Sequence, residues 1–206
     1  TNLINAGTYV IEPHLLQRVP PERRHSFERQ FFPGLLADNL PVFGFPSQAY
    51  WLDIGTPAKY LQAHRDILDR LLPFDLPGAE VLPGVWVEEG TVIEKGALVS
   101  GPCCFGRGCH VRSGAVIRGH CVLGHDCCVG PEAVLEGSVL LDGVRVGERS
   151  EVQRSILGRG VTLGQGVEVR ELCVLGERVS VGDRNELRMG LRVWPEREIP
   201  PDTLHF

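Results

Sequence analysis

Large apolar residues recur at every sixth position over much of the chain. From Val81 the series runs through Val87, Ile93, Val99, Phe105, Val111, Ile117, Leu123, Val129, Leu135 and Leu141. The step then slips by one residue through Val146 and Val152 and resumes at Leu157, Leu163, Val169, Leu175, Val181 and Leu187. A helix repeats every 3.6 residues and cannot keep a strict step of six. A rung of one short strand and one turn can, so the pattern predicts a parallel β-helix of about six coils, with three rungs in each coil.

The position four residues after each large one carries a small or β-branched side chain. Its occupants are Val85, Thr91, Ala97, Cys103, Cys109, Ala115, Cys121, Cys127, Ala133 and Val139, and later Cys173. We expect this position to lie at a corner of the coil, where only a small side chain fits. Five of the seven cysteines are therefore predicted to be packing residues. An odd cysteine count without paired CxxC motifs favours reduced thiols and a cytoplasmic protein.

The first 72 residues follow another pattern. They predict strands over 2–12 and 40–45, and helices that begin after Glu12, Ser26 and Thr56. So few elements cannot close a layered core. We therefore expect residues 1–72 to be the C-terminal part of an α/β domain and 73–80 a linker rich in Pro and Gly. Residues 81–190 would form the β-helix, and 191–206 a tail whose Leu204 and Phe206 cover one end of it.

Composition argues against two classes of partner. The net charge is −5, which disfavours a protein that coats nucleic acid or an anionic membrane. No apolar run approaches the ~20 residues that a membrane-spanning helix needs. The chain also lacks an initiating Met, so we expect it to begin inside a longer gene product or to be processed.

Three segments resemble the closing part of the catalytic domain of sugar-phosphate nucleotidylyltransferases. They are Ile4–Tyr9 (INAGTY), Ser26–Arg29 with Phe32–Pro33, and Tyr50–Tyr60 (YWLDIGTPAKY). The resemblance is strongest to the branch of mannose-1-phosphate guanylyltransferases, whose members carry a left-handed β-helix after the catalytic domain. It covers the whole chain but not the family's N-terminal half, which holds the glycine-rich nucleotide loop, another metal-binding Asp and a Lys. We therefore expect residues 1–206 alone to be inactive.

The resemblance implies an enzyme that joins a sugar 1-phosphate to a nucleoside triphosphate and releases pyrophosphate. For this branch the substrates would be mannose 1-phosphate and GTP, and the cofactor Mg²⁺. Asp53 matches a metal-binding, catalytic position, and Mg²⁺ prefers one or two carboxylates together with phosphate oxygens. Asn5, Gly7 and Glu28 match positions that bind the substrate. From the residues alone, Asp53 could equally stabilise a turn, Asn5 and Gly7 could form a bulged edge strand, and Glu28 could favour a helix N-terminus.

Two other functions remain open at this point. Many hexapeptide-repeat proteins are acyltransferases that use a histidine as general base, and the β-helix contains His110, His120 and His125. The chain could also be a non-catalytic regulatory or assembly subunit. Whichever function holds, we expect a homo-oligomer formed through the β-helix, because stacked coils leave open strand edges and flat faces. Charged residues suited to such a contact are Arg118, Glu136, Arg145, Glu148 and Arg149.

Overall fold

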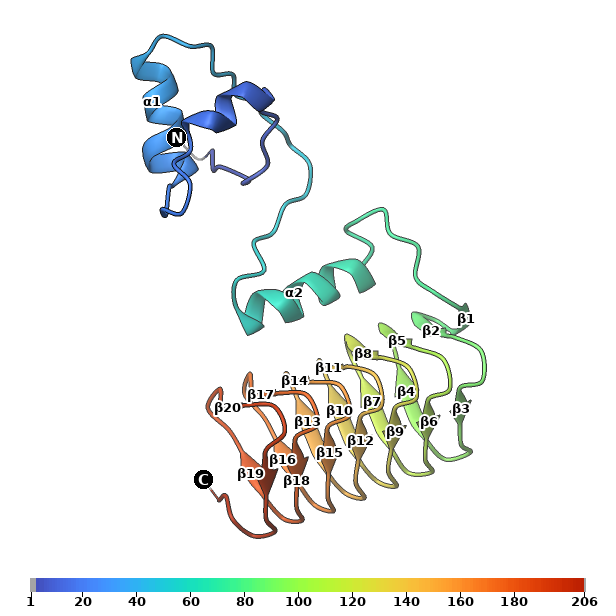
Figure 1. Cartoon of the computed structure of the whole chain (residues 1–206). Helices are drawn as coiled ribbons and strands as arrows, with labels where there is room; N and C mark the ends of the chain where they lie inside the picture. Colours follow the sequence, from blue (N-terminus) through green and yellow to red (C-terminus); the bar gives the residue numbers. More distant parts are fainter. Residues whose placement is uncertain (1–2, 206) are drawn as a thin grey trace. The chain divides into compact units, whose positions relative to one another are not determined.

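Residues 3–205 are described by the computed structural model in Figure 1, so Phe206 and the first two residues lie outside the described part. The chain divides into two compact units, one extending to Trp51 and the other beginning at Leu52. The first unit contains the 3-10 helix η1 (Pro13–Arg18), the π-helix η2 (Phe27–Phe31) and α1 (Phe32–Ala37). The second contains α2 (Pro57–Leu68) and all the strands.

The second unit is a parallel β-helix with three sheets, as predicted. Sheet A consists of β2 (Val85–Val87), β5 (Cys103–Phe105), β8 (Cys121–Leu123), β11 (Val139–Leu140), β14 (Ile156–Leu157), β17 (Val174–Leu175) and β20 (Arg192–Val193), with β1 (Ala79–Leu82) antiparallel at its edge. Sheet B consists of β3 (Val92–Ile93), β6 (His110–Val111), β9 (Cys128–Val129), β12 (Arg145–Val146), β15 (Thr162–Leu163), β18 (Ser180–Val181) and β21 (Glu198–Ile199). Sheet C consists of β4 (Leu98–Ser100), β7 (Val116–Arg118), β10 (Val134–Glu136), β13 (Glu151–Gln153), β16 (Glu168–Val169) and β19 (Glu186–Leu187).

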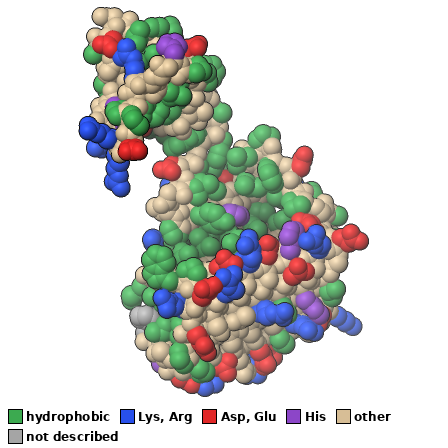
Figure 2. Space-filling view, in the orientation of Figure 1, with side chains coloured by type: hydrophobic (Ala, Val, Ile, Leu, Met, Phe, Trp, Pro, Cys, Tyr) green, Lys and Arg blue, Asp and Glu red, His purple; other side chains and the backbone are tan. Residues whose placement is uncertain are grey.

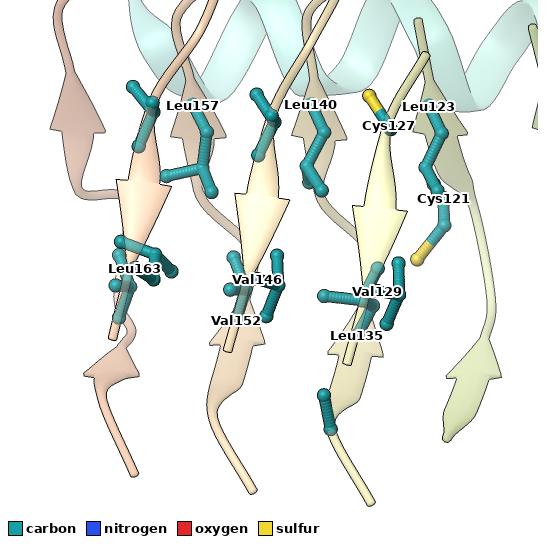
Figure 3. Close-up of a cluster of buried hydrophobic side chains, with 14 of the residues drawn as sticks. Cys121, Leu123, Cys127, Val129, Leu135, Leu140, Val146, Val152, Leu157 and Leu163 are labelled. Carbon is teal, nitrogen blue, oxygen red and sulfur yellow. The ribbon is translucent and has the colours of Figure 1, made fainter. Parts of the chain in front are cut away.

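The interior of the β-helix is filled by the six-residue series. Phe105, Val111 and Ile117 are fully buried, and Figure 3 shows the same inward direction in the middle coils. The corner position is confirmed for the five cysteines that were expected there, each at most 1% exposed: Cys103, Cys109, Cys121, Cys127 and Cys173. The thiols of Cys109 and Cys127 lie 3.0 and 3.2 Å from the carbonyl oxygens of Gly124 and Leu141 and can donate to them. These cysteines are packing residues.

Two successive coils are one residue shorter than the others, which the sequence pattern locates only approximately. Leu140 stacks between Leu123 and Leu157, so each of these steps is 17 residues. The prediction that Leu141 points inward is wrong. The coil is shortened by one residue at a point before Leu140, so Leu140 takes the inward position, and Leu141 is 37% exposed. The corner position then falls on Ser138 and not on Val139.

Serine hydroxyls satisfy the backbone at the shortened corners. Ser138 Oγ donates to the Glu136 carbonyl at 2.9 Å and accepts from the Ser155 amide at 3.1 Å. Ser155 Oγ donates to the Gln153 carbonyl at 2.8 Å. Both serines are fully buried, so water cannot reach the polar groups around them. The serine hydroxyls therefore satisfy backbone groups that would otherwise lack a hydrogen-bond partner.

The two ends of the β-helix differ from the expected boundaries. Val81 lies in the antiparallel strand β1 and is 52% exposed, so it is not an interior position. At the other end β20 and β21 fall in the segment expected to be a tail, because Val193 and Ile199 continue the step of six from Leu187. Leu204 packs against the core and so covers this end, as predicted.

The strands predicted over 2–12 and 40–45 are absent from residues 3–12 and 40–45. A strand forms only when a partner satisfies its backbone, and residues 3–51 provide none. The predicted helix starts are confirmed. Ser26 Oγ accepts from the Arg29 amide at 3.1 Å, and Thr56 Oγ1 accepts from the Lys59 amide at 3.3 Å.

Helix α2 covers the outer face of sheet A (Figures 1 and 3). The outward row of this sheet is apolar over six strands: Trp86, Cys104, Val122, Val139, Ile156 and Val174. Leu68 of α2 is 7% exposed and Val139 only 1%. Just after the helix, Asp69 Oδ1 lies 2.8 Å from His120 Nε2, and the Arg70 guanidinium stands 4.6 Å from the Trp86 ring centre. The helix is thus attached to the β-helix by apolar packing and two polar contacts.

The two kinds of interior position should respond very differently to substitution. We expect Cys121→Ala to change the free energy of unfolding by less than about 1 kcal/mol, because a small packing group replaces another. Ile117→Asp should prevent that coil from folding, because it buries an unpaired charge. Urea unfolding followed by circular dichroism measures both. Equal damage from the two substitutions would show that Cys121 does more than pack.

Candidate functional site

Three of the residues expected to bind substrate come together in the first unit. The Asn5 side-chain amide donates to Glu28 Oε1 at 3.1 Å and to the Tyr9 hydroxyl at 2.8 Å. Its other atom, Oδ1, accepts from the Gly7 amide at 2.8 Å and closes a tight turn. We call Asn5, Gly7, Tyr9 and Glu28 the Asn5 cluster. The structure therefore joins segments 23 residues apart in the chain.

Aromatic packing holds the Asn5 cluster in place. The Tyr9 ring stacks on Phe27 at 5.8 Å between centroids and meets Phe32 edge-on at 4.8 Å. The Phe31 ring, which is 3% exposed, contacts Phe27 and Phe32 with centroid distances of 4.8 and 5.6 Å. Because Ser26 caps η2, Glu28 falls in the first turn of that helix, where its carboxylate also complements the helix dipole. Glu28 thus has the structural role considered from the sequence as well as the contact with Asn5.

The Asn5 cluster is open to solvent. Asn5, Gly7 and Glu28 are exposed, and Gly7 has φ of +72° with nothing within 4 Å of where a Cβ would stand. The glycine thus permits the turn and leaves free space above it. Amide and carboxylate groups around such a space can exchange hydrogen bonds with sugar hydroxyls. Tyr9 was not among the predicted site residues, and its place inside the INAGTY segment was the only signal for it.

Asp53 lies in the second unit, three residues before Thr56, the N-cap of α2. Its carboxylate is exposed and has no hydrogen-bond or ion-pair partner within residues 3–205. Both of its oxygens would stand 3.6 Å from a Cβ on Gly55, so the glycine leaves one side of the carboxylate open. A free carboxylate suits a cation. Among the described residues, however, no group of three or more His, Cys, Asp or Glu side chains could hold a metal alone.

A shallow depression on the first unit carries positive charge that the sequence analysis did not single out. Its volume is about 680 Å³, and it is lined by Arg24, His25, Ser26, Arg29 and Gln30. Neither arginine has an ion-pair partner in the described part of the chain. The signal in the sequence was the short basic run Arg23-Arg24-His25. An anionic group such as a phosphate would complement this depression.

The three histidines of the β-helix are engaged by other side chains or backbone. His110 Nε2 lies 2.8 Å from Glu94, and His120 Nε2 lies 2.8 Å from Asp69. His125 Nδ1 lies 3.0 Å from the Arg107 amide and accepts its hydrogen bond. The acyltransferase interpretation therefore has less support.

Two known protein families match successive parts of the chain, in the order expected from the sequence. Residues 82–187 match the family described as the left-handed β-helix (LbH) domain of the eIF2B epsilon subunit, and residues 1–70 match the nucleotidyl transferase family. The β-helix is thus left-handed. The chain belongs to the sugar-phosphate nucleotidylyltransferases that carry such a domain. Within them it falls in the branch of the mannose-1-phosphate guanylyltransferases.

The chain is similar to relatives named for guanylyl transfer and for uridylyl transfer, and to one solved acetyltransferase domain. A probable mannose-1-phosphate guanylyltransferase 1 of Oryza sativa subsp. japonica is 33% identical, over 98% of this chain and 52% of the relative. A UTP–glucose-1-phosphate uridylyltransferase of Synechocystis sp. is 31% identical, over 52% of this chain and 32% of the relative. Among solved structures, the acetyltransferase domain of PglB from Neisseria gonorrhoeae is 16% identical with a TM-score of 0.47, and covers 65% of this chain and 63% of that chain. The chain spans about half the length of the full-chain relatives it matches.

Proposed function

We propose that the protein to which this chain belongs is a sugar-1-phosphate nucleotidylyltransferase. It would join mannose 1-phosphate to GTP and release pyrophosphate. The main support is the match to mannose-1-phosphate guanylyltransferases over 98% of this chain, in sequence order. The Asn5 cluster supports a sugar ligand, and the cationic depression of the first unit supports a phosphate-bearing one. A relative that is a uridylyltransferase makes UTP the alternative nucleotide to test.

The chain's own residues would act by binding and orientation. The Asn5 amide and the Glu28 carboxylate would hold sugar hydroxyls, while Gly7 lets the ring approach the backbone. Correct orientation of the attacking sugar phosphate lowers the barrier of a displacement at phosphorus. We also propose a cytoplasmic location, which the use of five thiols as packing residues supports.

Asp53 fits one ligand position of a Mg²⁺ ion. Its carboxylate is exposed and unpaired, and Mg²⁺ usually takes one or two carboxylates and completes its shell with phosphates and water. Bound there, the ion would neutralise charge on the substrate phosphates. Asp53 would hold that ion and, through it, position the phosphates.

Asp53→Asn in the full-length gene product should lower turnover sharply and leave the fold intact. The substitution keeps the shape and removes the charge that holds the ion. Loss of a direct ligand costs at least ~2 kcal/mol of transition-state stabilisation, or about 30-fold in rate. Pyrophosphate release measures it, with Asp75→Asn in the linker as the control. A decrease under about threefold would remove Asp53 from the metal site, and an inactive full-length protein would favour the regulatory-subunit alternative.

Asn5→Ala should weaken sugar phosphate binding more than nucleotide binding. Because its amide orients Glu28 and would contact sugar hydroxyls, we expect KM for the sugar 1-phosphate to rise about tenfold while KM for the nucleotide stays within about twofold. Steady-state kinetics with each substrate varied in turn gives both values. Equal changes in the two constants would mean that Asn5 only supports the local fold.

We further propose that the β-helix forms a homo-oligomer, and the open first coil supports this more than the charged faces do. At the first coil, β3 and β4 are edge strands of sheets B and C, and their outward residues Val92 and Leu98 are 50% and 65% exposed. By contrast, the Arg118 and Glu136 side chains already pair with each other at 2.9 Å. An unpaired apolar edge tends to associate with another chain.

Light scattering at micromolar concentration should therefore give a mass that is a multiple of the monomer's 22.7 kDa. Leu98→Asp should shift the mass towards the monomer, because it places a charge at the open end. Met189→Asp, at a position 79% exposed elsewhere on the β-helix, is the matched control. A monomer mass for the unsubstituted chain would show that the β-helix is a spacer.

A further inference from the structure

The turn that ends α2 is held to the β-helix by the side chains of two successive residues. Asp69 Oδ1 lies 2.8 Å from His120 Nε2. The Arg70 guanidinium stands 4.6 Å from the centre of the Trp86 ring, and its Nη1 donates to the Phe74 carbonyl at 2.9 Å. Figure 2 shows hydrophobic side chains gathered where α2 meets the β-helix. The end of the helix is therefore fixed by specific contacts in addition to apolar packing.

His120 has a backbone conformation that favours glycine. Its φ is +54°, and its counterpart one coil further along is Gly137, also with φ of +54°. A side chain in this left-handed region costs backbone energy that glycine avoids. Within residues 3–205 the His120 ring pairs with Asp69, in the segment after α2, and makes no hydrogen bond to the β-helix itself. The histidine thus serves the contact with that segment and not the coil that contains it.

Helix α2 carries Asp53 at its other end. Asp53 lies three residues before Thr56, whose hydroxyl accepts from the Lys59 amide at 3.3 Å and so caps the helix. Asp53, α2 and the β-helix all belong to the second unit. Because a capped, hydrogen-bonded helix of 12 residues is stiff, its placement on sheet A decides where the Asp53 carboxylate lies within this unit.

We propose that His120 and Trp86 are positioning residues for Asp53, and that they act through α2. They hold the end of the helix, the helix holds the segment before Thr56, and that segment carries the carboxylate. The inference rests on the proposed role of Asp53 as a Mg²⁺ ligand. Groups that orient a ligand without touching the ion influence how tightly the ion is bound. Loss of either contact should therefore raise the Mg²⁺ concentration that the enzyme requires.

These contacts contribute little to the stability of the β-helix itself. The His120 and Asp69 side chains are 27% and 38% exposed, and polar pairs that water reaches stabilise a fold only weakly. Trp86 lies on the outward row of sheet A and is outside the interior cluster of the β-helix. The positioning role can therefore be measured separately from folding.

The first test replaces His120 by glycine in the full-length gene product. Glycine suits the left-handed backbone, so the urea midpoint of the β-helix should not fall, although the contact with Asp69 is lost. We expect the amides of α2 to exchange hydrogen at least about threefold faster. The Mg²⁺ concentration for half-maximal pyrophosphate release should rise at least about threefold. Arg154→Gly, at the same corner one coil beyond Gly137 and with φ of +44°, is the matched control and should change neither quantity.

Two results of this test would overturn the inference. Unchanged hydrogen exchange in α2 would show that His120 does not hold the helix. Faster exchange with an unchanged Mg²⁺ requirement would show that the helix does not position Asp53. Asp53→Asn tests the metal role separately, because it changes the ligand and leaves the contacts of α2 in place. A failure of the proposed function is thus distinguishable from a failure of this inference.

The second test uses the ring of Trp86. Trp86→Leu removes the aromatic face beside the Arg70 guanidinium and should raise the Mg²⁺ requirement at least about threefold. Trp86→Phe keeps such a face and should restore the requirement to within about 1.5-fold of that of the unsubstituted protein. Trp194→Leu, at a position 79% exposed elsewhere in the second unit, is the matched control. Equal effects of Trp86→Leu and Trp86→Phe would overturn the positioning role of Trp86.

Discussion

Hydrogen bonds between successive coils dominate this structure, because they force every coil to take the same cross-section. A residue at a corner stands directly beneath its counterpart one coil later, so neither can be large. Cys, Ala, Val, Ser and Thr fill these corners, and several of them donate into the next coil. Thr91 Oγ1 and Ser150 Oγ reach the Gly106 and Gly164 carbonyls, each at 2.7 Å. The choice of corner residue therefore follows from backbone geometry and not from any chemistry of the thiol.

The three outer faces of the β-helix are specialised despite this common frame. Sheet A presents an apolar row and is covered by α2, whereas sheet C stacks Glu151, Glu168 and Glu186 on adjacent strands. Like charges at strand spacing repel one another, and Arg170 and Arg188 offset this by pairing with them. The Glu151 carboxylate raises the pKa of Arg170, as expected for a close pair. The apolar row thus gives the segment that carries Asp53 one face on which to pack.

The sequence predicted the β-helix well because the six-residue repeat can be recognised from the residue type at each position alone. The prediction failed where the orientation of a side chain depends on which residues stack next to it. Leu140 and Leu141 are equally apolar, and only the stacking with Leu123 decides which of them points inward. The strand expected around Asn5 failed for a related reason, since apolar alternation cannot supply a missing partner strand. For the site, resemblance to a family indicated Asn5, Gly7 and Glu28, and the structure added Tyr9, whose role depends on a contact across the fold. Asp53 was found through the same resemblance, and its role as a ligand stays a prediction.

A helix that packs on a repetitive surface can in principle occupy several equivalent positions along it. Along sheet A the outer row has approximate translational symmetry, so α2 could slide by one coil, about 4.8 Å, and still contact apolar side chains. The two contacts at its end break that symmetry. One coil further along, Gly137 stands where His120 does and Cys104 where Trp86 does, so Asp69 and Arg70 would find no equivalent partners. His120 and Trp86 thus fix the position of α2 along the otherwise repetitive sheet A. They thereby determine the coil against which the segment that carries Asp53 is aligned.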